Sequence, residues 1–206
     1  MPKHTTRIKL APSRFVVGID EAGRGPLAGP VSVGAVMVTT SFNKGFFKGI
    51  KDSKKLSSDE RELWFELAVE EKRRGNLDFA VSLVSSEIID KKGISYAIKL
   101  GIKRCLAKIN APHDAQIFLD GSLHASKEFT HQLTVVRGDE KIPIVSLASV
   151  LAKVTRDRYM ERLSKKIPEY GFHLHKGYGT FMHRVAIKLY GPSPYHRLTF
   201  LKNINK

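Results

Sequence analysis

Two apolar, β-rich segments that each end at an acidic side chain constrain the fold of this chain most. The segment 14–20 (RFVVGID) is apolar on both faces and ends at Asp20, which Glu21 follows. The segment 115–120 (AQIFLD) ends in the same way at Asp120. Such segments predict strands buried inside a sheet. A carboxylate at the end of a buried strand is costly unless a cation answers it.

The remaining segments complete an α/β pattern. Residues 31–39 predict a second strand, and the turn at 22–30 is too short for a helical crossover, so the first two strands should form an antiparallel hairpin. We also predict strands at 77–84 and 133–136. Helices should run from Ser57 or Ser58 to Gly75, over 94–109, from Pro143 to about Ser164 and over 179–190. This order predicts an α/β domain with a mixed sheet.

The charge of the chain favours a polyanionic partner. There are 35 Lys and Arg against 20 Asp and Glu, a net charge of +15. Residues 153–206 contain 12 of these cations and only 3 of the acids. Nucleic acid is the first expectation, a membrane surface the second, and plain solubility the alternative.

Other classes of protein are excluded by composition. No apolar run approaches the roughly 18 residues of a membrane span. The single cysteine, Cys105, provides neither an internal disulfide nor a zinc cluster. We therefore expect a protein of the reducing cytoplasm.

The acids at the strand ends predict a metal site. If the two apolar strands are neighbours, Asp20, Glu21 and Asp120 converge where open α/β sheets bind ligands. Asp139 follows the last predicted strand and adds a fourth carboxylate. An oxygen-only cluster suits Mg²⁺ or Mn²⁺ rather than Zn²⁺. Two such ions held by carboxylates are typical of phosphodiester hydrolysis. The alternative is that each acid is a salt-bridge partner or a turn former.

Three further motifs are candidates for substrate contacts. The glycine-rich turn at 23–30 lacks the Lys-Ser/Thr ending of a phosphate-binding Walker loop, but its glycines allow close approach of a ligand to the backbone. Ser53 and Lys54 precede a helix start, where a phosphate can bind. Tyr178 lies between glycines, where an aromatic ring can stack on a base or sugar. The alternatives are a hairpin turn, a solvated capping segment and a tyrosine that packs inward.

Five motifs in one order resemble those of ribonuclease HII, the bacterial type 2 ribonuclease H. They are 18–31 (GIDEAGRGPLAGPV), 52–57 (DSKKLS), 119–121 (LDG), 146–157 (SLASVLAKVTRD) and 175–180 (HKGYGT). The resemblance implies a ribonuclease H-like mixed five-stranded sheet flanked by helices, with a helical C-terminal part. It also implies a single catalytic domain, with a core at 14–165 and a basic extension at 166–206.

The resemblance implies an endonuclease with two substrates. It would hydrolyse the RNA strand of RNA–DNA hybrids and nick 5′ of a single ribonucleotide embedded in duplex DNA. Two Mn²⁺ or Mg²⁺ ions would support the reaction, which leaves 5′-phosphate and 3′-hydroxyl ends. The expected roles are RNA primer removal and ribonucleotide excision repair, by a monomer that binds no membrane.

The resemblance also assigns residues. The implied metal-binding and catalytic residues are Asp20, Glu21, Asp120 and Asp139. The implied substrate-binding residues are Gly23, Arg24, Gly25, Ser53, Lys54, Lys153, Lys176 and Tyr178, and Lys55, Arg156 and Arg184 are further candidates for phosphate contacts. Asp157 competes with Asp139 as the fourth acid, but its spacing from Lys153 favours a structural salt bridge. The rival hypotheses are a non-catalytic nucleic-acid-binding module and another metal-dependent nuclease of the same superfold.

Overall fold

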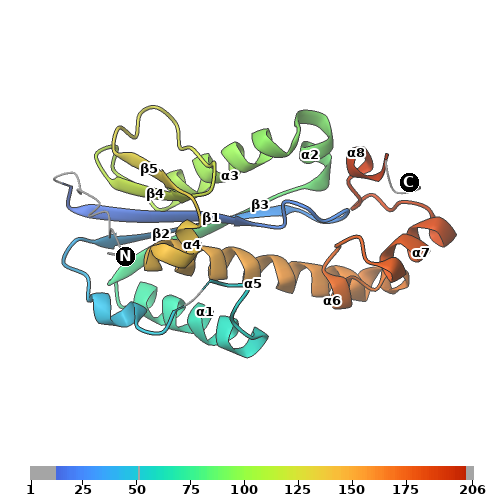
Figure 1. Ribbon diagram of the computed structural model, residues 1–206, viewed down its shortest axis with the longest axis horizontal. Coiled ribbons are helices and arrows are strands. Elements are labelled where there is room, and N and C mark those ends of the chain that lie inside the picture. The colour runs from blue at the N-terminus through green and yellow to red at the C-terminus, as the bar shows by residue number, and fades with distance from the viewer. Residues whose placement is uncertain (1–12, 51, 203–206) are drawn as a thin grey trace, which may run out of the picture.

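One mixed sheet organises the protein (Figure 1). The computed structural model describes residues 13–50 and 52–202. The strands lie in the order β3–β2–β1–β4–β5. Strand β1 pairs antiparallel with β2 and parallel with β4, which in turn pairs parallel with β5. Their bounds are β1 (Phe15–Ala22), β2 (Val31–Thr39), β3 (Leu77–Val84), β4 (Gln116–Asp120) and β5 (Gln132–Val135).

The helices confirm the predicted α/β class and add elements that the sequence did not reveal. They are α1 (Ser58–Arg73), α2 (Ser86–Lys92), α3 (Ile94–Lys108), α4 (Gly138–Lys141), α5 (Pro143–Lys166), α6 (Phe172–His175), α7 (Phe181–Tyr190) and α8 (Leu198–Leu201). Ser57 is the N-cap of α1 and forms a capping box with Glu60. Helices α2, α4, α6 and α8 were not predicted as separate elements. Within the described residues, no helix has the length and apolar character needed to cross a membrane.

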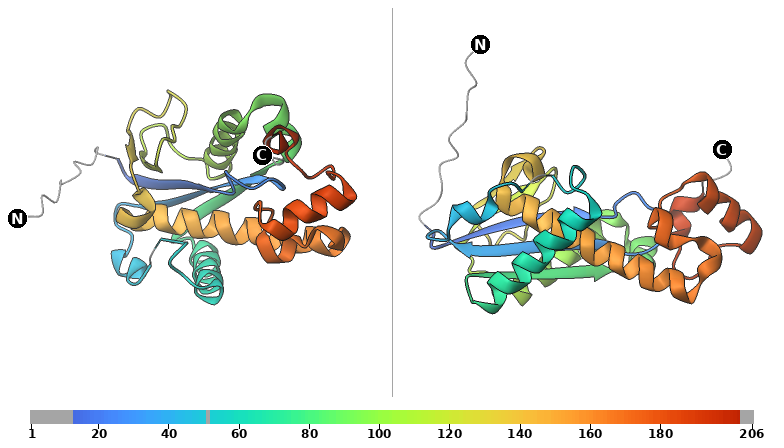
Figure 2. Two further views of the ribbon diagram at one scale, coloured as in Figure 1. Left: turned by 45° about the vertical axis from the view of Figure 1, so that its right-hand side comes forward. Right: turned by 90° about the horizontal axis from the view of Figure 1, so that it is seen from below.

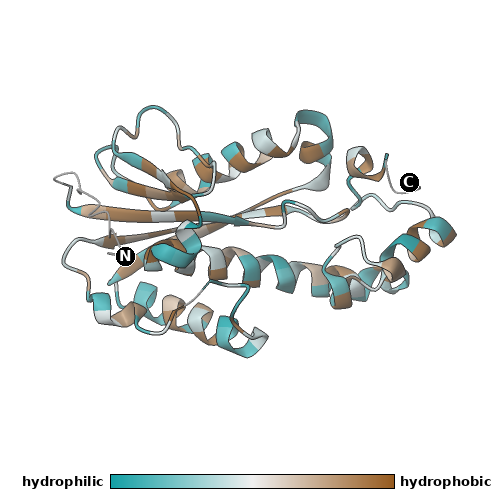
Figure 3. Ribbon diagram, in the orientation of Figure 1, coloured by the Kyte–Doolittle hydropathy of each residue, from teal (hydrophilic) through white to brown (hydrophobic). Residues whose placement is uncertain are grey.

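Helices cover both faces of the sheet (Figures 1 and 2). On one face, Val17 and Val33 of the sheet pack in a cluster with Ile102 of α3. On the other face, Val36 packs in a cluster with Leu147 of α5. The strands between these layers are largely apolar along their length (Figure 3). Burying both faces in this way explains why β1 and β2 are apolar on both sides.

Glycine brings α5 close to the sheet. A Cβ atom added to Gly18 would lie 2.5 Å from the carbonyl carbon of Ile144 at the start of α5. A side chain at this position would therefore push the helix away from the strand. The glycine lets α5 lie against β1, the strand that ends at the acids.

The C-terminal elements pack beyond the end of the sheet (Figure 2). Met160 of α5, Phe172 of α6 and Ile187 of α7 form a cluster with Ala28 of the glycine-rich turn. The amide of Leu27 also donates to the carbonyl of Gly177, with an N···O distance of 2.8 Å. The C-terminal part therefore lies beside the turn that follows β1.

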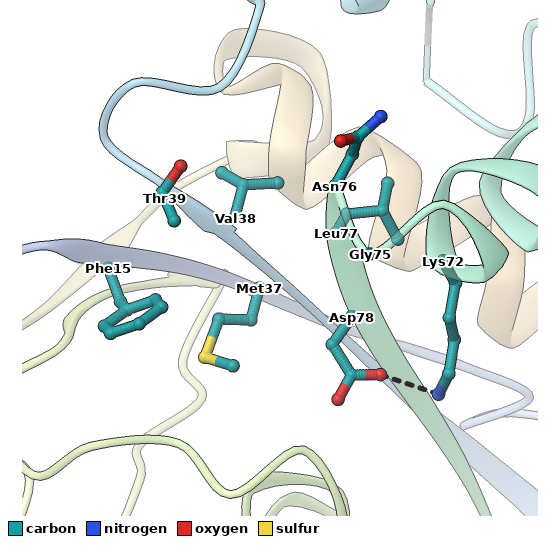
Figure 4. Close-up of a pocket in the computed structure, with 9 residues that line it drawn as sticks. All are labelled: Phe15, Met37, Val38, Thr39, Lys72, Gly75, Asn76, Leu77 and Asp78. Carbon is teal, nitrogen blue, oxygen red and sulfur yellow. Dashed lines mark ion pairs between the residues drawn. The ribbon is translucent and has the colours of Figure 1, made fainter.

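A cavity at the opposite end of the sheet has a different character (Figure 4). It lies where β1 begins and β2 ends, and Phe15 and Met37 line it. The Lys72 ammonium pairs there with the Asp78 carboxylate at 2.6 Å. Asp78 is the one carboxylate among its lining residues, and its charge is already compensated. The acids predicted from the sequence lie at the other end of the strands.

Candidate active site

The four predicted carboxylates line one cavity of about 220 Å³. Because Ile19 of β1 pairs with Leu119 of the parallel strand β4, Asp20 and Asp120 lie side by side at the strand ends. Glu21 follows on β1, and Asp139 lies on α4. Three elements that are distant in sequence therefore meet at this edge of the sheet, as the two strand ends predicted.

Asp120 holds α4 at the site. Its Oδ1 atom accepts a hydrogen bond of 2.6 Å from the amide of Gly138, the first residue of α4. The preceding residue, Arg137, adopts a left-handed conformation with φ of 55° and turns the chain into the helix. Asp139 is thereby buried beside the strand ends, rather than lying in an open loop after β5.

Burial disfavours the charged form of these acids in the absence of a cation. Burial and the charge of Glu21 raise the pKa of Asp20 well above its usual value. Burial also raises the pKa of Glu21, against the opposing charge of Arg24. The pKa of Asp139 is raised by burial and by the charge of Asp120. The site thus concentrates negative charge that water solvates poorly.

Two exposed cations offset part of this charge. Arg24 Nη1 lies 3.2 Å from Glu21 Oε1, and Lys54 Nζ lies 3.7 Å from Asp139 Oδ2. Burial alone would lower the pKa of Lys54, but the charges of Asp139 and other nearby acids raise it. The side chains of Arg24 and Lys54 are 50% and 81% exposed. They can therefore move aside without leaving a buried cation unpaired.

The donor set fits a hard divalent cation. All four side chains offer oxygen, the ligand that Mg²⁺ and Mn²⁺ prefer. Glu21 Oε2 is buried and has no hydrogen-bond partner among the described residues. Within that part of the chain, however, no three His, Cys, Asp or Glu side chains form an arrangement ready to hold an ion. The acids share a cavity without forming a closed coordination shell.

The glycine-rich turn and Tyr178 line the same cavity. Gly23 has φ of 85°, a conformation that favours glycine. Tyr178 is 45% exposed, so its ring is available to a ligand and does not pack fully inward. The turn and the tyrosine thus form the wall of the cavity next to the C-terminal helices.

Neutral histidines support the backbone at Tyr178. Because a carbonyl only accepts, His183 Nδ1 must donate to the Tyr178 carbonyl, which lies 2.8 Å away. His183 Nε2 then accepts from His196 Nε2 at 3.0 Å, while His196 Nδ1 accepts from the Ser193 amide at 2.9 Å. Burial lowers the pKa of both histidines to about 4. The chain of hydrogen bonds is therefore uncharged at neutral pH.

Some of the other predicted substrate-binding residues line the cavity and others lie outside it. Lys54, Ser53 and Lys153 line the cavity. The Ser53 hydroxyl is buried against the Ser149 hydroxyl at 2.9 Å. Lys176 lies outside the cavity, with its ammonium 2.9 Å from the Glu161 carboxylate.

Asp157 pairs with Lys153 at 2.7 Å, so the structure confirms the predicted salt bridge. Lys55 pairs with Glu140 at 3.4 Å, and Arg184 Nε donates to the Gly179 carbonyl at 3.0 Å. Of these groups, only Ser53, Lys54 and Lys153 line the cavity itself.

The structure contradicts one prediction. Arg156, a candidate for phosphate contact, is 1% exposed and donates to three backbone carbonyls. Sequence reasoning also missed Ser149, which lines the cavity, and Arg197, which donates to the carbonyls of Gly23 and Arg24. The only sequence feature that included Arg197 was the basic C-terminal quarter, and that feature suggested an exposed residue.

Comparisons with known proteins agree on one family. The ribonuclease HII family model matches residues 17–203. The ribonuclease HII of Rickettsia bellii is 44% identical over 201 residues, covering 96% of this chain and 95% of its own. That of Caldicellulosiruptor bescii is 41% identical over 191 residues, covering 93% and 88%.

Solved structures of type 2 ribonucleases H have the same fold as this chain. The ribonuclease H2 of Pyrococcus horikoshii has a TM-score of 0.69 at 29% identity, covering 92% of this chain and 96% of its own. The ribonuclease HII of Archaeoglobus fulgidus, solved in complex with PCNA, has a TM-score of 0.69 at 30% identity, covering 89% and 94%. The chain therefore belongs to the ribonuclease HII family and is a ribonuclease H endonuclease.

Proposed function

We propose that this enzyme hydrolyses the RNA strand of RNA–DNA hybrids and nicks duplex DNA 5′ of a single embedded ribonucleotide. The observation that carries the proposal is the convergence of Asp20, Glu21, Asp120 and Asp139 with the turn at 23–25 and Tyr178 around one cavity. A non-catalytic nucleic-acid-binding module is disfavoured, because buried acids at a phosphate-binding surface only repel the ligand unless a cation is present.

We propose that the four carboxylates bind Mn²⁺ or Mg²⁺. When bound, two such ions supply the activation of water and the stabilisation of the leaving oxygen. Asp20 is buried at the centre of the cluster, and Glu21 Oε2 is a buried oxygen that lacks a partner. Arg24 and Lys54 occupy the outer side of the acids and would turn toward the substrate as ions neutralise the carboxylates.

Recognition of the ribonucleotide falls to the turn and the tyrosine. The 2′-hydroxyl distinguishes RNA from DNA at one nucleotide. The backbone of Gly23, Arg24 and Gly25 can approach that hydroxyl because two of the three residues have no side chain. Tyr178 would stack on the neighbouring deoxyribose, where a second 2′-hydroxyl would be crowded.

The basic groups around the cavity would position the duplex without reading its sequence. Lys54 has an exposed ammonium, Lys153 lines the cavity, and Lys176 lies with Lys153 in the wall of a second pocket. Their ion pairs with Asp139, Asp157 and Glu161 would be exchanged for phosphates. We propose roles in primer removal and ribonucleotide repair for a cytoplasmic monomer.

Replacing Asp20 with asparagine tests the proposal. The variant Asp20→Asn keeps the size of the side chain and removes the charge at the centre of the acids. We expect cleavage of both substrates to be lost, by a factor of about a thousand or more, while hybrid binding at low salt persists. The Asp78→Asn variant is the matched control, because its ion pair with Lys72 lies at the opposite end of the sheet, and it should keep wild-type cleavage. Cleavage by Asp20→Asn near the wild-type rate would overturn the assignment.

A further inference from the structure

Two arginines are buried behind the cavity. Arg156 is 1% exposed and Arg197 is 0% exposed, and they are among the largest fully buried side chains of residues 13–50 and 52–202. A buried guanidinium is costly unless its donors are satisfied. The described residues give neither one an ion-pair partner within 4.0 Å. Backbone carbonyls compensate the two guanidinium charges instead. The segments that contain these carbonyls therefore indicate what the two arginines do.

Arg197 binds the glycine-rich turn from behind. Its Nη2 donates to the Gly23 carbonyl at 2.7 Å, its Nη1 to the Arg24 carbonyl at 2.9 Å and its Nε to the Gly29 carbonyl at 3.0 Å. One rigid fork therefore fixes both ends of the turn. Lysine could not do this, because an ammonium is a compact donor rather than a planar fork.

These bonds also orient the amides of the turn. In a trans peptide the N–H group points opposite to the carbonyl of the same unit. The carbonyls of Gly23 and Arg24 face Arg197, so the amides of Arg24 and Gly25 face away from it. Among the described residues, neither amide has an acceptor. Both residues line the cavity, so Arg197 presents two free backbone donors at its wall.

Arg156 joins this turn to the Tyr178 loop. Its Nε donates to the Pro30 carbonyl at 2.9 Å and its Nη2 to the Ala28 carbonyl at 3.1 Å. Its Nη1 donates to the Lys176 carbonyl at 2.9 Å. The guanidinium carbon lies 5.9 Å from the centroid of the Tyr178 ring, at the outer limit of a cation–π contact. Together with the Gly177 carbonyl, which accepts hydrogen bonds from the amides of Leu27 and Ala28, this side chain fixes the distance between the ring and the turn.

We propose that Arg156 and Arg197 are positioning residues that give the site its preference for a single ribonucleotide in DNA over a continuous hybrid. Arg197 holds the amides of Arg24 and Gly25 in place, and Arg156 holds Tyr178 at a fixed distance from them. A single ribonucleotide depends on both contacts at once, whereas a continuous hybrid can bind in several registers. The inference rests on the proposed function and concerns the geometry of the same site.

The test compares two substrates across matched variants. Arg197→Lys and Arg156→Lys keep the charge and remove the fork, and Arg158→Lys is the control on α5. Arg158 pairs with Glu62 and lies over the Phe65 ring, away from the cavity. Values of kcat and KM are measured on DNA with one embedded ribonucleotide and on a continuous hybrid of the same sequence. All assays run well below the melting temperature of each variant.

We expect the ratio of kcat/KM for the embedded ribonucleotide to kcat/KM for the hybrid to fall about tenfold in Arg197→Lys and Arg156→Lys. Arg158→Lys should leave it unchanged. An equal loss of kcat/KM on both substrates would show that the two arginines only support the fold, and would overturn the inference. An unchanged ratio would overturn it too.

A double-mutant cycle separates positioning from folding. If Arg156 acts through the aromatic ring, Arg156→Lys should lower the ratio in the wild-type background and leave it unchanged in a Tyr178→Ala background. Losses that multiply in the double variant would contradict this route. A wild-type enzyme that does not nick at the embedded ribonucleotide would refute the proposed function. A wild-type enzyme that nicks there, with lysine variants of unchanged ratio, would refute only the inference.

Discussion

Replacing Gly23 with alanine should destabilise the protein far more than the same replacement at Gly25, two residues along the same turn. A Cβ atom on Gly23 would overlap the Nε and Cδ atoms of Arg156. Arg156 cannot move aside easily, because it is buried and donates to three carbonyls. A Cβ atom on Gly25 would meet no atom within 4 Å.

The magnitude follows from two costs. Gly23 has φ of 85°, and an L-residue in the left-handed region costs roughly 1–2 kcal/mol. Displacing Arg156 breaks at least one hydrogen bond from a charged donor, which costs about 1.5–3 kcal/mol. The sum is about 2.5–5 kcal/mol, or roughly 5–20 °C in melting temperature for a chain of this size. Gly25→Ala should change stability by less than about 1 kcal/mol.

Thermal unfolding followed by circular dichroism, without divalent metal, measures both variants. The nicking assay adds an independent readout. Gly25→Ala should fold normally and still lose activity, because its backbone faces the cavity that we assign to the substrate. A Gly23→Ala variant that melts within about 2 °C of Gly25→Ala would refute the anchoring role of Arg156.

Two further predictions concern the ring and the acids. Tyr178→Ala should lower cleavage at embedded single ribonucleotides about tenfold or more and affect long hybrids less. Parallel kinetics on the two substrates measure this, and an equal loss on both would reject the junction-sensing role. Burial raises the pKa of Asp20, so its protonated form stabilises the fold at low pH, and this contribution is lost as pH rises through the raised pKa. In metal-free buffer at neutral pH, Asp20→Asn should therefore be more stable than wild type by about 1–2 kcal/mol. The difference in stability should shrink as pH falls toward 3.8. Melting curves across pH measure it, and an absent or reversed difference would disprove the prediction.

The strand ends were predictable because simple rules govern them. A segment that is apolar on both faces must be central in the sheet, and parallel neighbours place their ends together. The pairing of Ile19 with Leu119 brings Asp20 beside Asp120 for this reason. The start of α1 was predicted to within one residue, since the sequence offered Ser57 or Ser58 as the cap and the structure shows Ser57, in a capping box with Glu60.

Other features depend on tertiary contacts that local sequence does not carry. Helix α4 is only four residues long, and the Asp120 side chain holds its first residue in place. The sequence placed Asp139 after the last predicted strand, but it did not show that Asp139 lies on a short helix held by Asp120. Arg156 was grouped with the other basic residues as a candidate for phosphate contacts, and nothing in its local sequence marks it as buried, since arginine is normally exposed. Its burial depends on carbonyls more than a hundred residues away in the chain.

The most direct test of the central claim is a nicking assay on duplex DNA with one embedded ribonucleotide, labelled at the 5′ end. The reaction is run with Mg²⁺, with Mn²⁺ and with chelator. We expect a nick on the 5′ side of the ribonucleotide that requires the metal and leaves a 3′-hydroxyl on the labelled fragment. Binding of the duplex without a nick in the presence of either ion, or a nick that persists in chelator, would contradict the account.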